Sequence, residues 1–271
     1  MIEHAKEMMG MNIELRKLLD SDKETYFELE NETWVNKRML QDEEANDRSW
    51  KAMFADTEAH YVVLMGDQIC GFASILKLGE EVQEFGLELF ERFRHQGIGY
   101  AALVRLLEIC KNEYHVKKLH SKVYPDNFPS ILLMRKIGGT PYEITENPCI
   151  EESLRTEFQK DNAELISDNV KRMAELFGVE PELLLSNLLV FQIPLQPAEI
   201  RFSLSLTGDL SYEKKIETKA INHMYQETTR ILKSILEKAK KGTEEDFRKE
   251  MMDMIENLES RMQCRTEQGD F

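Results

Sequence analysis

The feature that most constrains the fold is a strand that runs through a glycine-containing turn into a helix. Between residues 82 and 90, charged residues and glycine alternate with large apolar residues, which is the two-residue period of a strand with one buried face. A turn at 94–99 follows, with glycine at 97 and 99, and an apolar helix is predicted over about 100–114. Backbone N–H groups and the positive end of the helix dipole converge at such a junction, so the segment predicts a phosphate site. A turn that needs glycine for its geometry alone is the alternative.

Strand and helix patterns alternate along the first half of the chain, and helical periodicity dominates the second half. In the first half, further strands are predicted at 11–16, 60–64, 68–76, 118–124 and 140–145, and helices at 20–32, 43–54 and 129–136. In the second half we expect helix over 150–177, a further helical turn or two at 181–187, and strands at 188–193 and 200–206. An antiparallel hairpin of two amphipathic helices follows, the second over about 243–262. This succession predicts an α/β (α+β) fold.

The composition excludes several classes of protein. Acidic residues outnumber basic ones by 50 to 35, which gives a formal charge of −15 without a basic stripe, so we expect no nucleic-acid partner. No apolar run approaches the roughly 18 residues that cross a bilayer, and residues 1–10 do not resemble a secretory signal, so we expect no membrane partner and a cytoplasmic protein. Cys70, Cys110, Cys149 and Cys264 are widely spaced with no histidine at ligand spacing, which predicts reduced thiols and no metal site.

Several motifs around the glycine turn occur in an order that resembles the GNAT superfamily of acyl-CoA N-acyltransferases. The first resembles the family's fourth strand and its R/Q-x-x-G-x-G/A pyrophosphate loop, through Glu84, Phe85, Gly86, Leu87, Leu89, Arg94, Gln96, Gly97, Ile98 and Gly99. The second resembles the fifth strand and the helix pattern N-x-x-A-x-x-L-Y-x-K-x-G-F, through Val123, Tyr124, Pro125, Asp126, Asn127, Ser130, Leu133, Lys136 and Gly138. Residues 61–72 resemble the family's central hairpin and 189–195 its closing strand. The resemblance covers about residues 10–147 and 188–195.

The resemblance implies a mixed, mostly antiparallel twisted sheet flanked by helices, with acetyl-CoA (coenzyme A) as co-substrate. In the family the fourth and fifth strands splay apart, and the pantetheine arm adds to the exposed backbone between them like a further strand. The residues implied to bind the cofactor are Leu89, Arg94, His95, Gln96, Gly97, Ile98, Gly99, Tyr100 and Asn127. For Asn127 an alternative stays open, in which its side chain caps the helix that follows.

The family's reaction is the attack of an amine on a thioester, which requires a base because only the neutral amine attacks. Glu84 and Glu88 are the implied candidates, with Glu84 preferred because it falls where many family members carry a glutamate on the fourth strand. The alternative is that both are solvated acids of the strand. Met134 stands where the family usually has the tyrosine that protonates the thiolate, and methionine donates no proton. Tyr124 and Tyr142 are candidate replacements, with packing as the alternative for each. Water is a third source of the proton, since a thiolate with a pKa of roughly 8.5 leaves tolerably without help.

The resemblance also organises the chain. We expect a transferase domain at 10–195, with a helical insertion at about 148–187, and an extension at 196–271 made of a strand and the helical hairpin. The implied function is transfer of an acetyl, or another short acyl, group to a primary amine of a small molecule or a protein. The acidic composition favours a cationic acceptor. The alternative is a catalytically weak CoA-binding module whose C-terminal helices bind a partner or form a homodimer.

Overall fold

The described residues of the protein form a single sheet of seven strands. The computed structural model describes residues 12–32, 43–196, 202–208, 210, 215–239 and 249. Within them the strand order is β1-β2-β3-β4-β5-β7-β6, and β4–β5 is the parallel pair among antiparallel neighbours. The strands are β1 Ile13–Lys17, β2 Ala59–Met65, β3 Gln68–Leu76, β4 Gln83–Leu89, β5 Leu119–Val123, β6 Thr140–Glu146 and β7 Asn187–Ile193. The predicted α/β fold with a mixed, mostly antiparallel sheet is confirmed.

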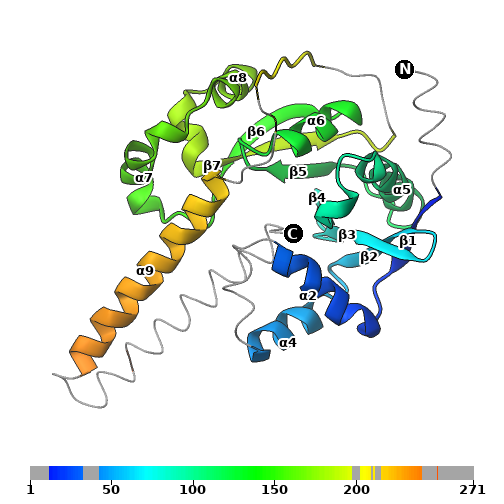
Figure 1. The fold of residues 1–271 in the computed structure, drawn as a ribbon, viewed down its shortest axis with the longest axis horizontal. Helices are drawn as coiled ribbons and strands as arrows, with labels where there is room; N and C mark the ends of the chain where they lie inside the picture. The colour runs from blue at the N-terminus through cyan, green and yellow to red at the C-terminus, as the bar shows by residue number, and fades with distance from the viewer. Residues whose placement is uncertain are drawn as a thin grey trace.

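Helices cover both faces of this sheet (Figure 1). They are α2 Lys23–Glu32, α4 Glu43–Ala52, α5 Ile98–Asn112, α6 Phe128–Lys136, α7 Arg155–Asp161, α8 Asp168–Phe177 and α9 Lys215–Ala239. Alternate residues of a strand face opposite sides of a sheet, and the two core clusters follow this rule. Val62 and Phe72 pack with α2 and α4, whereas Val63 and Ala73 pack with α5 and α6. The sheet therefore separates two apolar layers.

Helix α5 begins where the glycine turn ends. Its buried residues recur every three or four positions, as in a helix with one face against a core: Ile98, Ala102, Leu103, Leu106, Leu107 and Cys110. The predicted helix is confirmed, and it starts two residues earlier than expected because Gly97 is its N-cap, at φ +83°. Since most residues avoid this left-handed conformation, glycine at 97 fixes the start of α5.

The segment between β6 and β7 is an insertion whose two ends meet. The N–H of Asn147 donates to the carbonyl of Ser186 at 3.1 Å, directly between the ends of the two paired strands. The helical segment expected over 150–177 is divided between α7 and α8, which are separate helices. At the end of α7 the Asn162 side-chain amide donates to the carbonyl of Phe158 at 2.8 Å, and the Ser167 hydroxyl caps α8 by accepting the N–H of Val170 at 3.3 Å.

The strand expected at 200–206 is also wrong in its described part. Residues 202–208 belong to no strand of the sheet. Their alternation has another cause: Leu204 is buried in the main core, and the Phe202 ring stacks on the Phe191 ring at 6.0 Å. Side chains replace the missing strand partners, since Arg135 donates to the carbonyl of Leu204 and Asn169 to that of Thr207.

Helix α9 is joined to the sheet at its N-terminus and then extends away from it (Figure 1). The backbone N–H of Ile216 donates to the carboxylate of Asp126, in the turn between β5 and α6, at 2.9 Å. Ile216, Ala220 and Ile221 are buried in the main core. The second helix of the expected hairpin, at 243–262, lies outside the described residues. Among the described helices, α9 included, we find none long and apolar enough to cross a bilayer.

Candidate functional site

Strands β4 and β5 separate after a short contact. Their parallel pairing comprises Gln83 with Leu119 and Glu84 with His120, although β4 continues to Leu89 and β5 to Val123. Beyond Glu84, β4 bonds to β3 alone among the described strands. The two strands thus open into a V, with a free backbone edge along the second half of β4.

The hydrogen-bond pattern identifies the backbone groups on this free edge. The N–H of Phe90 donates to the carbonyl of Cys70, next to β3, and the N–H of Gln83 donates to the carbonyl of Lys118, next to β5. Successive residues of a strand direct their backbone groups to opposite edges. The odd-numbered residues of β4 therefore face β5, and those beyond the paired part are Phe85, Leu87 and Leu89.

The glycine turn leads from the end of this edge to the start of α5. His95 and Gly97 both have positive φ, at 61° and 83°. No side chain caps α5, and within the described part of the chain no hydrogen bond uses the N–H groups of residues 95–100. These groups lie around the positive end of a helix of 15 residues, which is the arrangement that binds a phosphate.

Two side chains hold the turn in place. The Arg94 Nε–H donates to the carbonyl of Leu89 at 2.9 Å, and the Gln96 amide donates to the carbonyl of Arg92 at 2.6 Å. Arg94 thus binds the turn to the last residue of β4. In addition, Lys136 Nζ lies 4.8 Å from the centre of the Tyr100 ring, which brings a positive charge to the first turn of α5.

Small and apolar groups line the inner wall of the V. A Cβ atom on Gly99 would lie 3.6 Å from methyl groups of Leu87, Leu89 and Leu133, so β4, α5 and α6 meet at this glycine. Met134, on the other hand, is 2 % exposed and belongs to the main core. The position at which the family usually has a tyrosine is thus occupied here by a side chain that packs in the core.

Glu84 lies where the two strands separate, and its charge is used locally. Its Oε1 is 3.0 Å from the Nζ atoms of both Lys77 and Lys122, and the side chain is 10 % exposed. The neighbouring His120 ring lies 4.6 Å from the Tyr142 ring, and burial lowers the pKa of His120. The structure therefore presents Glu84 as the centre of an ion-pair network.

Glu88 lies on the same side of β4 as Glu84, in a different environment. It lines a small cavity under α2, together with Tyr26 and Glu30. Burial raises the pKa of the Tyr26 hydroxyl well above its usual range, and the charges of Glu30 and Glu88 raise it further. Tyr26 and Glu30 were missed by the sequence analysis. Their spacing of four residues on a predicted helix was the available signal, because such residues share one face.

The remaining predicted residues have structural roles in the described chain. The Asn127 side chain accepts the N–H of Ser130 at 3.2 Å and caps α6, so the alternative reading of this residue has a clear geometric basis. Tyr124 is 9 % exposed and packs in the main core at the end of β5. Tyr142 is 55 % exposed on β6.

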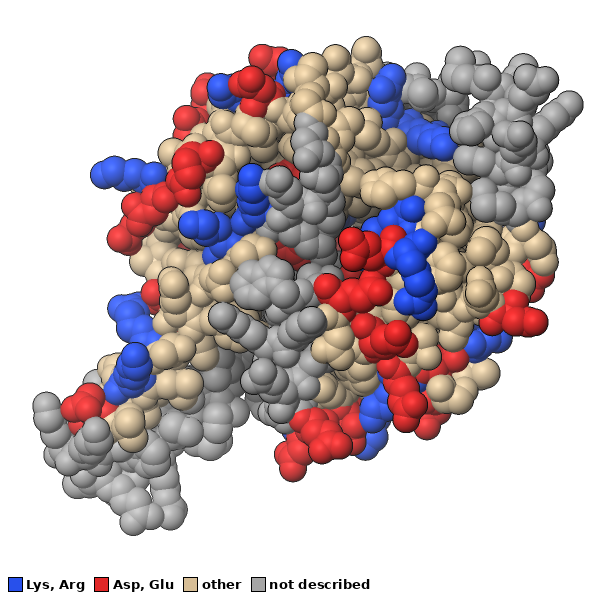
Figure 2. Space-filling model, in the orientation of Figure 1, with Lys and Arg blue, Asp and Glu red and all other residues tan. Residues whose placement is uncertain are grey.

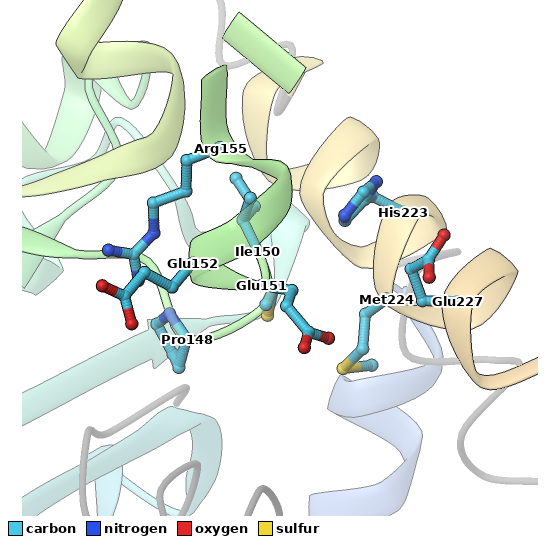
Figure 3. A pocket seen from close by; sticks show the side chains of 9 residues that line it. Pro148, Ile150, Glu151, Glu152, Arg155, His223, Met224 and Glu227 are labelled. Carbon is cyan, nitrogen blue, oxygen red and sulfur yellow. The ribbon is translucent and has the colours of Figure 1, made fainter. Parts of the chain in front are cut away.

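A second cavity, of about 240 Å³, lies between the start of the insertion and α9 (Figure 3). His223 on α9 lines it, and so does Arg155 on α7. Its charged lining is largely paired, because Arg155 forms an ion pair with Glu146, and Glu227 forms one with Arg230 at 2.6 Å. Since this lining mixes both signs of charge, it favours no single class of ligand.

Comparison with known sequences identifies the core of the chain. Residues 12–140 match the sequence model described as an acetyltransferase (GNAT) domain. The chain carries a GNAT acetyltransferase domain. The predicted family is thereby confirmed for residues 12–140. The matched segment of the GNAT domain contains the V, the glycine turn and both candidate bases. No curated protein sequence matches the chain significantly.

The solved structures that are similar to the chain include the following three, all at low sequence identity. One is the spermidine N-acetyltransferase of Vibrio cholerae in complex with CoA and spermine: 13% identity and a TM-score of 0.47, over 67% of this chain and 94% of that one. Another is the Campylobacter jejuni N-acetyltransferase PseH in complex with acetyl coenzyme A: 19% and 0.39, over 48% and 90%. The third is a domain from Methanocaldococcus jannaschii: 22% and 0.42, over 49% and 91%.

Proposed function

We propose that the GNAT domain transfers an acetyl, or another short acyl, group from acyl-CoA to a primary amine by direct attack in a ternary complex. The observation that carries this proposal is the free edge of β4 next to the uncapped N-terminus of α5. A pantetheine arm offers amide groups to such an edge, and the pyrophosphate at its end needs clustered N–H donors. Residues 85–100 provide both the free strand edge and the clustered N–H donors.

The cofactor residues follow from this placement. The N–H groups of His95, Gln96, Gly97, Gly99 and Tyr100 would bind the pyrophosphate, and Ile98 would anchor the start of the helix through its buried side chain. The backbone of Leu89 would bond to the pantetheine arm. Arg94 would act by positioning, since its guanidinium already donates to the carbonyl of Leu89.

The chemistry requires one proton acceptor and one departing thiolate. The amine nitrogen attacks the thioester carbonyl, the new N–C bond forms as the C–S bond breaks, and the nitrogen loses a proton. We assign the base to Glu88, because Oε1 of Glu84 is bonded to two lysines. The CoA thiolate then takes a proton from water, with Tyr124 as the alternative donor. Met134 is buried in the core and contains no acidic proton.

The acceptor of this proposal is an amine that arrives as a cation. On the face drawn in Figure 2, a run of acidic side chains extends from the centre of the described surface toward its lower edge, near α2 and α4. A surface of this sign raises the local concentration of cationic amines. The charge of −15 acts in the same direction.

The proposal is tested by measuring the release of CoA thiol from acetyl-CoA across a panel of amines. We expect release that depends on the amine, and loss of acetyl-CoA binding in Gly97→Glu, because a carboxylate side chain would occupy and repel the phosphate position. Unchanged affinity in this variant would refute the loop assignment. Measurable acetyl-CoA binding without turnover of any amine would refute the transferase and favour the binding module.

A further inference from the structure

We propose that the small cavity under α2 binds the ammonium group of the acceptor, and that Glu30 determines specificity for unbranched primary amines. This inference rests on the proposed function and names the site of its second substrate. The cavity lies between α2, the end of α4 and strands β2 to β4. Its polar lining comprises Tyr26, Glu30, His60, Ser74 and Glu88.

The charge of the cavity selects a cation. Glu30 is 8 % exposed and Glu88 is half-buried, and both raise the pKa of Tyr26, so the two carboxylates lie close to the same phenol. The cavity lining includes no lysine or arginine within the described chain. Two carboxylates in a largely buried space favour a positively charged occupant, because charge-assisted hydrogen bonds offset the desolvation of all three groups.

A buried hydroxyl in the same cavity points to a ligand independently of the acids. Ser74 is 3 % exposed, and its Oγ has no hydrogen-bond partner in the described part of the chain. Buried hydroxyls normally have a partner, and a missing one calls for an explanation. Glu30, Glu88 and Ser74 are three side chains with acceptor oxygens, so each can accept one of the three N–H donors of an ammonium group.

The size of the cavity limits the substitution of the nitrogen. Its volume is about 20 Å³, enough for a group of about the size of one water molecule. An –NH₃⁺ group has this size, whereas a trimethylammonium group is several times larger. Because the cavity has room for little more than the nitrogen group, the alkyl chain must lie outside it, so we expect unbranched primary amines to fit and N-methylated amines to be excluded.

The position of the cavity brings the nitrogen close to the reacting edge. Residues 86–88 of β4 line the cavity, and the same stretch contributes Leu87 to the free edge. Since neighbouring strands lie about 4.8 Å apart, a pantetheine arm at that edge would lie about one strand spacing from this segment. An ammonium group in the cavity would thus lie on the α2 side of the same segment, and Glu88, which lines the cavity, would take its proton before attack.

The test measures amine binding without acyl transfer. The full-length protein is saturated with CoA, which carries no acyl group, and titrated by calorimetry with propylamine, protonated at pH 7 like a lysine side chain, or with N,N,N-trimethylpropylammonium. We expect propylamine to bind at least about tenfold more tightly than the trimethylated cation. We expect Glu30→Gln to weaken propylamine binding on the order of 10- to 100-fold, as for loss of a charged hydrogen bond.

The matched control is Glu28→Gln, which removes the same charge from an exposed position of α2 and should change binding less than about twofold. Ser74→Ala should weaken binding by about two- to tenfold and remains informative if Glu30→Gln fails to fold. Equal binding of the two cations, or equal effects of the Glu30 and Glu28 variants, would overturn the proposal. Absence of thiol release would refute the proposed function while leaving this binding result unaffected.

Discussion

Replacing Glu84 by Gln should reduce stability far more than it reduces catalysis. The Glu84 carboxylate is 10 % exposed and lies 3.0 Å from two ammonium groups, whose side chains are 21 % and 14 % exposed. Removing one member of a fully buried ion pair costs about 3–5 kcal/mol, because the remaining charge has lost its partner. Here both lysines keep some contact with water, so we expect about 2–3 kcal/mol, or a decrease in Tm of about 5–10 °C for a chain of this size.

Glu88→Gln is the matched comparison, because it makes the same chemical change four residues away on the same side of β4. Its predicted loss appears in kcat, by about 100-fold or more, since a general base contributes about 10²- to 10⁴-fold. Thermal unfolding and thiol-release kinetics on both variants separate the two effects. Glu84→Gln with an unchanged Tm and a 100-fold lower kcat would refute this reasoning and make Glu84 the base.

Three further changes test other parts of the structure. Gly71→Ala would place a Cβ atom 2.0 Å from a backbone carbonyl oxygen of β4, so chemical denaturation should show a free energy of unfolding lower by about 3 kcal/mol. Gly66→Ala, in an open turn with positive φ, should lower the free energy of unfolding by about 1 kcal/mol. Asn127→Ala should cost about 1 kcal/mol as a lost helix cap and leave acetyl-CoA affinity unchanged, whereas a large loss of affinity would return this residue to the cofactor site. Burial raises the pKa of the Asp126 carboxyl in the folded protein. The stability that the protonated carboxyl contributes is therefore lost as the pH rises through that raised pKa. Asp126→Asn should have a higher Tm than the wild type at neutral pH, and the difference in Tm should vanish toward about pH 4. A difference that is constant across pH would contradict this assignment.

The sheet and its helices could largely be predicted because local periodicity and core packing agree. All seven strands of the sheet were expected close to their observed positions, and α5 differs by its first turn only. The wrong predictions concern segments whose residue pattern is compatible with two different structures. The alternation of apolar and polar residues at 202–206 is compatible with a strand. It is equally compatible with a coil whose apolar side chains pack on the core and whose backbone accepts hydrogen bonds from side chains such as Arg135.

Only the part of the candidate site that is formed by consecutive residues could be predicted from the sequence. The turn at 94–99 forms from consecutive residues, so its motif is visible in the sequence. The difference between Glu84 and Glu88 was not visible, because it depends on Lys77 and Lys122, which approach from two other parts of the chain. The cavity under α2 combines residues from α2, β3 and β4, and their proximity is a product of tertiary folding.

The bond between Asn147 and Ser186 has a consequence for how this fold can vary. Because the two ends of the insertion are joined there, β6 and β7 form in effect a hairpin with an oversized loop, and the register of their pairing is independent of what the loop contains. Lengthening a closed loop costs little entropy, about 0.6 kcal/mol for each doubling. Residues 148–185 also supply buried side chains to the main core, among them Phe158, Met173 and Leu185, so a replacement segment would have to cover the same apolar surface, while the V and the glycine turn are built from residues outside this loop.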